Sequence, residues 1–91
     1  MAHHNELAML MLAVVDGLNE AMCDGDDAGY DGKWLKQPID DHYDHAGAHV
    51  MNMNGQPVPE VYEEEVNHAL FRLAAIKVKL MQKRAAIGDL S

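Results

Sequence analysis

Three histidines and three aspartates fall within residues 40–49, although the whole chain of 91 residues holds only six histidines. In a helix, Asp41, His45 and His49 stand at positions i, i+4 and i+8 and so line one side. His42 and His45 are three residues apart and can also share a site. Carboxylates and imidazoles bind divalent metal ions, and they serve as general acids and bases near neutral pH. The alternative interpretation is a solvated, acidic helix start.

A second polar group lies further along the chain, where Glu64, His68 and Arg72 again stand at i, i+4 and i+8. Glu65 and His68 form Glu-x-x-His, the spacing with which helical bundles present a carboxylate and an imidazole to metal ions. If the two segments pack as antiparallel helices, both groups meet. The predicted metal ligands are then Asp41, His45, His49, Glu64, Glu65 and His68. A surface ladder of i, i+4 pairs is the alternative.

The elements that must position these side chains are three helices, which we expect at about residues 5–22, 40–53 and 59–87. Apolar residues recur at spacings of three and four in each of them. The loop 23–39 and the turn 54–58 separate the helices, because both are rich in glycine, proline and polar residues. We find no strand pattern. The sequence therefore predicts a single all-α domain with a long C-terminal helix and an antiparallel helical hairpin.

Helix ends and single residues give further expectations. Asn5 and Asp40 are the expected N-caps of the first two helices. Trp34 is expected to anchor the loop to the core, with stacking against a base as the alternative. Cys23 is the only cysteine, so no intrachain disulfide can form, which is typical of a reducing cytoplasm. We expect the Cys23 thiol to be buried.

Two patterns of apolar residues predict a homo-oligomer. The first helix is apolar on most sides and must therefore be buried on most sides, which in a small protein implies a partner chain. The third helix has two apolar stripes. The first stripe can pack on the other two helices and consists of Tyr62, Val66, Ala69, Leu73, Ile76, Leu80 and Ile87. The second stripe needs another surface and consists of Phe71, Ala74, Val78, Met81 and Ala85.

Charge is divided unevenly along the chain. Residues 1–65 carry a net charge of −12 and residues 66–91 carry +4, which add to the total of −8. An acidic chain of this kind is not expected to bind duplex nucleic acid, since that requires clustered lysine and arginine. The apolar run 7–15 is too short to span a bilayer and has no features of a signal peptide. We therefore expect a cytoplasmic protein that makes no contact with a membrane.

Several short segments resemble, in the same order, a phage-associated helical family, the dATP/dGTP diphosphohydrolases of the N-terminal type. The resemblance covers about residues 28–76, although Ala48 stands where the family carries an arginine. The matching segments are Tyr30-Asp31-Gly32-Lys33-Trp34, Pro38, Asp41-His42-Tyr43-Asp44-His45-Ala46, His49, Glu65, His68-Ala69-Leu70 and Arg72-Leu73.

The resemblance implies a phage-type protein of the host cytoplasm that is directed at purine deoxynucleotides, either hydrolysing or sequestering them. Carboxylates and histidines would hold Mg²⁺ or Mn²⁺, and a metal-bound water would attack phosphorus. The catalytic candidates are His45, His68 and Glu65. The candidates for binding the nucleotide are Arg72, Lys33, Lys36 and Trp34. The alternative function is an acidic, non-enzymatic inhibitor that binds and blocks a host protein, either to counter a host defence or as a mimic of nucleic acid, so catalysis is left open.

Overall fold

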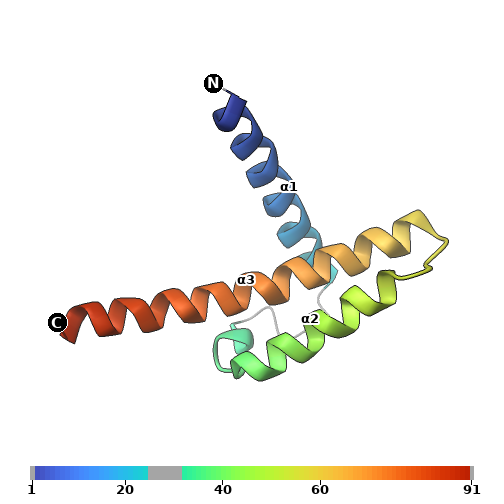
Figure 1. Ribbon diagram of the computed structural model, residues 1–91. Coiled ribbons are helices and arrows are strands. Elements are labelled where there is room, and N and C mark those ends of the chain that lie inside the picture. The colour runs from blue at the N-terminus through green and yellow to red at the C-terminus, as the bar shows by residue number, and fades with distance from the viewer. Residues whose placement is uncertain (1, 25–31, 91) are drawn as a thin grey trace.

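The computed structural model describes residues 2–24 and 32–90 and contains only helices over these ranges (Figure 1). In chain order the elements are α1 (Ala2–Asp24), the 3-10 turn η1 (Lys33–Leu35), α2 (Ile39–Met53) and α3 (Pro59–Leu90). The prediction of an all-α fold with a long C-terminal helix is confirmed. No helix of the described ranges is both long enough and apolar enough to cross a membrane.

The α2 and α3 helices form an antiparallel hairpin, in which α2 lies along the first half of α3 (Figure 1). The connection is tight because Gly55 adopts a φ of +75°, a conformation that side chains other than glycine disfavour. The backbone nitrogen of Val58 donates to Oε1 of Gln56 over 3.2 Å. Pro59 then opens α3, at the helix position where a missing N–H costs nothing.

The α1 helix crosses α3 at a point of close approach and does not contact α2 within the described ranges. Gly17 and Ala21 are buried at the crossing. A Cβ atom added to Gly17 would lie 2.8 Å from Cδ1 of Leu70 and 3.0 Å from Oδ1 of Asn67. The N-terminal part of α1 projects away from α3, and the C-terminal part of α3 extends beyond α2 (Figure 1). The fold is therefore a hairpin with two protruding arms.

The η1 turn lies before α2, and two contacts of this turn join it to α3. The Trp34 ring meets the Phe71 ring edge to face, with centroids 6.0 Å apart and planes inclined by 76°. Nζ of Lys79 donates to the carbonyl oxygen of Leu35 over 2.7 Å. The expected anchoring of this segment by Trp34 is thus present in the structure.

The buried core is small and contains polar groups. Its buried apolar residues are Ala21, Ala46, Ala69, Phe71 and Ala75. His42, Asn67 and Arg72 are also buried, and His42 and Arg72 are the largest fully buried side chains. Most large aliphatic side chains of α1 and of the C-terminal half of α3 lie on the surface instead.

Three local expectations are wrong. The α1 helix begins at Ala2, so Asn5 lies inside it and is not its cap. The N-cap of α2 is Pro38, whose carbonyl oxygen accepts hydrogen bonds from the next turn, while Asp40 lies in the first turn, where its charge still favours the helix dipole. The Cys23 thiol is exposed rather than buried, because α1 contacts α3 on another side.

The two stripes of α3 take the roles expected for them only in part. Phe71, Ala74 and Val78 face Leu18 of α1 and the η1 turn, where they line a common apolar hollow. Tyr62, Leu73, Leu80 and Ile87 of the first stripe are 41–67% exposed. Ala69 of the same stripe is buried, so the first stripe is divided between the core and the surface, because α2 packs on a polar side of α3.

Candidate functional site

His42 lies at the centre of the hairpin with no exposed surface. Its Nε2 atom is 2.9 Å from the carbonyl oxygen of Trp34, and its Nδ1 atom is 3.0 Å from Nη1 of Arg72. A carbonyl can only accept and a guanidinium can only donate, so Nε2 carries the proton and Nδ1 accepts. His42 is therefore held as the neutral Nε2–H tautomer, which links η1, α2 and α3.

The Arg72 guanidinium is 1% exposed and serves the same internal network. Besides His42, its Nη1 atom donates to Oε1 of Gln37 over 3.0 Å. Gln37 lies between η1 and α2, so one guanidinium nitrogen joins α3 both to α2 and to the connection that precedes α2. Arg72 was predicted to contact phosphate, and the structure places it inside the hairpin.

His49, Glu65 and His68 come together nearer the hairpin turn. Nδ1 of His49 donates to Oε2 of Glu65 over 2.8 Å, and both side chains are about one-fifth exposed. The His49 and His68 rings stack, with centroids 5.1 Å apart and planes inclined by 23°. The antiparallel packing expected from the sequence therefore joins half of the predicted ligand set.

Asp41 and His45 lie on the outer side of α2, where both are exposed. Nδ1 of His45 donates to the backbone carbonyl of Asp41 over 2.8 Å, a contact within the helix. Residues four apart are displaced by about 40° around an α-helix, so two such steps move a side chain well away from its starting side. His49 consequently faces α3, while Asp41 does not.

The same rotation of about 40° for every four residues separates the side chains of Glu64, His68 and Arg72 on α3. Glu64 points to a groove shared with α1, His68 faces His49, and Arg72 reaches His42. The six predicted metal ligands thus lie in three places. Within residues 2–24 and 32–90, no group of three or more His, Cys, Asp or Glu side chains is arranged to hold a metal ion. The involvement of Mg²⁺ or Mn²⁺ stays a prediction.

The remaining candidates lie around η1. The side chains of Lys33 and Lys36 are exposed there, on either side of the half-buried Trp34. The indole of Trp34 is in contact with the Phe71 ring. These three side chains share one short segment, although none of the contacts described here joins either lysine to the imidazoles of the hairpin.

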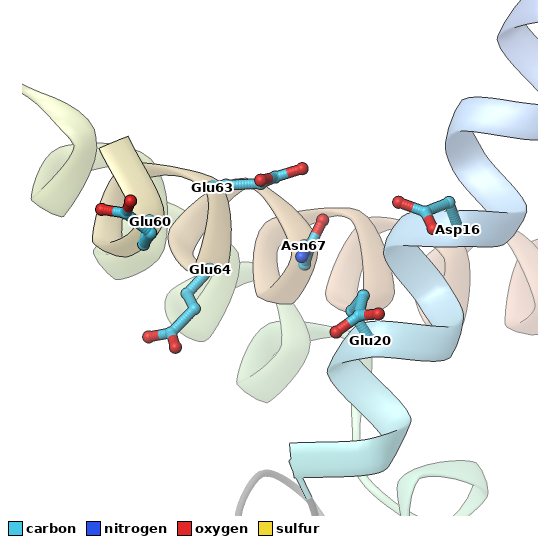
Figure 2. A pocket seen from close by; sticks show the side chains of 6 residues that line it. All are labelled: Asp16, Glu20, Glu60, Glu63, Glu64 and Asn67. Atoms are coloured by element: carbon cyan, nitrogen blue, oxygen red, sulfur yellow. The ribbon is translucent and has the colours of Figure 1, made fainter. Parts of the chain in front are cut away.

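A groove between α1 and α3 is the feature that the sequence interpretation missed, and we call it the acidic groove (Figure 2). Its volume is about 340 Å³. It is lined by Asp16, Glu20, Glu60, Glu63, Glu64 and Asn67, five carboxylates and one amide. Asn67 lies between the carboxylates of the two helices and is only 8% exposed (Figure 2).

The sequence contained a signal for the acidic groove. Residues 60, 63, 64 and 67 follow the i, i+3, i+4, i+7 pattern of one helix face, and Asp16 and Glu20 are four apart. The pattern indicates an acidic face on each helix, but it does not indicate that the two faces meet. Their meeting depends on the close approach of α1 at Gly17, which is a tertiary contact.

Comparisons with protein families, with curated proteins and with solved structures give no match to this chain. The resemblance to the dATP/dGTP diphosphohydrolases therefore stays a prediction.

Proposed function

We propose that this chain is a helical binding module that self-associates and carries out no chemistry of its own. The observation that supports this proposal is the exposed apolar surface of α1. Seven large apolar side chains of this helix are 38–72% exposed, namely Leu7, Met9, Leu10, Met11, Leu12, Val14 and Val15. Contiguous apolar surface of this kind is typical of protein interaction sites.

The exposed surface continues a helix face that is already used for packing. Leu7, Leu10 and Val14 are followed at helical spacing by Leu18 and Ala21, which lie beside α3. Leu7, Leu10 and Val14 also line one shallow apolar hollow together with two neighbours. One face of α1 is thus covered by α3 at its C-terminal end and open towards its N-terminal end, where another helix can extend the contact.

A second copy of the chain is the occupant that the molecule itself suggests. Leu73, Leu80 and Ile87 of α3 are exposed at intervals of seven residues, the repeat with which helices pack against one another. Each large apolar side chain that moves from water into such an interface contributes on the order of 1–2 kcal/mol. Because a two-fold interface uses every such residue twice, a modest contact suffices for association.

The experiment is a comparison of Leu10→Glu with Asn5→Glu, since both substitutions add one negative charge to α1. We expect light scattering after size exclusion to give the wild type a multiple of the 10.1 kDa chain mass. Leu10→Glu should weaken association by about tenfold or more, because a carboxylate cannot be buried cheaply in an apolar contact. Asn5→Glu should associate as the wild type does. Equal association of both variants would contradict the proposal.

The predicted inhibitor of a host protein would use surfaces of the same kind, and self-association does not exclude it. The nucleotide interpretation has less support from the geometry. The Nη1 atom of Arg72, the expected phosphate ligand, donates to Gln37 and His42, and the carboxylates of the acidic groove repel polyphosphates.

A further inference from the structure

We infer that the acidic groove receives the basic segment of α3, residues 77–84, from a second copy of the chain. This inference rests on the proposed self-association and specifies its geometry. The segment carries Lys77, Lys79, Lys83 and Arg84, while the groove carries five carboxylates.

The composition of the groove favours an extended cation over a single ion. The carboxylates come from two helices, and the described residues contain no cluster arranged for a metal ion. Charges distributed in this way suit a ligand whose cationic groups are also distributed, such as the side chains of a basic helix.

Asn67 provides an independent indication that the groove takes a polar ligand. It is more than nine-tenths buried and faces the groove between the acidic side chains of α1 and α3 (Figure 2). Its amide makes no hydrogen bond to another residue of the described ranges. A buried amide normally has a partner, and a lysine ammonium or an arginine guanidinium would supply a donor to its oxygen.

The basic segment lies on the arm of α3 that extends beyond the hairpin, and so it is available to another molecule (Figure 1). Lys79 is the exception, since it bonds to Leu35 of its own chain. Lys77, Lys83 and Arg84 remain, and the nearby Leu80 and Met81 are 47% and 49% exposed. The segment thus combines cations for the groove with apolar side chains for the open face of α1.

An antiparallel arrangement of the two α3 helices satisfies both copies at once. One register sets Glu63 of each copy opposite Arg84 of the other, because these two residues lie nearly six whole turns apart and so on about the same side of α3. The partner helix passes beside the crossing of α1, and the two-fold axis gives each copy one groove and one basic segment. The interface closes on itself as a dimer and leaves neither site open for further growth.

Charge reversal with a mixing step tests the inference. The first variant is Glu63→Lys with Glu64→Lys, and the second is Lys83→Glu with Arg84→Glu. Each variant alone opposes like charges in both halves of the dimer, so we expect its dissociation constant, measured by sedimentation, to rise about tenfold or more. Mixing the two variants restores opposite charges in both halves. The mixture should form a heterodimer about as tight as the wild-type dimer.

The matched control is Asp40→Lys with Asp41→Lys, which makes the same change in net charge as the first variant but on exposed residues of α2, away from the groove. We expect this control to dimerise as the wild type does. The wild-type dissociation constant should also rise with salt, because exposed charge pairs are screened.

The possible outcomes separate this inference from the proposed function. A wild-type chain that stays monomeric would overturn both. A wild-type dimer whose affinity is unchanged in both reversal variants would overturn the groove contact and leave self-association standing. Weakened variants that do not recover on mixing would also overturn the contact, because the pairing of the two sites would then be wrong.

Discussion

His42 and Arg72 share a buried hydrogen bond of 3.0 Å that joins α2 to α3 at the middle of the hairpin. It is one step in a polar ladder along the interface. His49 pairs with Glu65 on one side of it, and Lys79 reaches the carbonyl of Leu35 on the other. Hydrogen bonds require matched partners, so this ladder specifies the register of the hairpin more narrowly than aliphatic contacts would.

Replacing His42 by alanine should destabilise the fold strongly. The substitution removes the acceptor for a buried guanidinium and the donor for the Trp34 carbonyl, and it leaves a cavity. We expect a loss of about 2–4 kcal/mol in the free energy of unfolding. Urea denaturation followed by circular dichroism measures it.

The control for this prediction is His45→Ala on the exposed side of α2. Its imidazole contacts only the carbonyl of Asp41 in the same helix among the hydrogen bonds described above. We expect a change within about 0.5 kcal/mol. Equal losses for the two histidines would mean that the His42–Arg72 network does not stabilise the hairpin.

The partly exposed pair of His49 and Glu65 should contribute less to the stability of the hairpin than the buried pair of His42 and Arg72. Glu65→Gln keeps an oxygen that can accept from His49 and removes only the charge, at a site where both side chains are about one-fifth exposed. We expect a loss of no more than about 1 kcal/mol in unfolding free energy. A loss in unfolding free energy as large as that of His42→Ala would contradict the prediction that the His49–Glu65 contact contributes less than the His42–Arg72 contact.

Alanine substitutions at Gly17 and Gly47 together test the close crossing of α1 and α3. Both lie within helices, where alanine is favoured over glycine by about 1 kcal/mol. A Cβ atom at Gly47 meets nothing within 4 Å, whereas one at Gly17 meets Leu70 and Asn67 at 3.0 Å or less. Gly47→Ala should therefore raise thermal stability, and Gly17→Ala should be less stable than Gly47→Ala by about 1 kcal/mol or more. Thermal denaturation measures both variants. Equal gains in stability would contradict the close packing of Gly17 in α1 against Leu70 and Asn67 in α3.

A thermal-shift assay separates the binding module from the nucleotide interpretation. We expect dATP and dGTP, with and without Mg²⁺ or Mn²⁺, to leave the melting temperature unchanged. A ligand that binds the native state raises it according to concentration and affinity. A rise of several degrees that disappears in His68→Ala would favour the nucleotide interpretation over ours.

Much of the fold could be predicted from the sequence, because the helices are long and their ends carry clear signals at Pro38 and Pro59. The grouping of side chains could be predicted only in part. Spacings of i, i+4, i+8 suggested single lines of ligands, but the helix rotates about 40° at each step. Residues 42, 46 and 49, at i, i+4 and i+7, in fact face α3. The i, i+4, i+7 spacing therefore indicates the side of α2 that faces α3 better than the i, i+4, i+8 spacing does.

The central role of His42 and Arg72 could not be read from the sequence for a different reason. An arginine in an acidic protein normally lies in water, and its burial depends on acceptors supplied by Gln37 and His42 from other segments. Such a match is a property of the packed hairpin. The acidic groove likewise exists only where Gly17 brings α1 against α3.

Sedimentation equilibrium of the wild-type chain over a wide range of concentrations tests self-association most directly. The exposed face of α1 predicts a mass that rises from that of the 10.1 kDa chain towards twice this value. At 1 M salt the apolar contribution persists while the charge pairs weaken, so the dimer should become weaker but remain detectable. A mass that stays at that of one chain at every concentration would contradict the account.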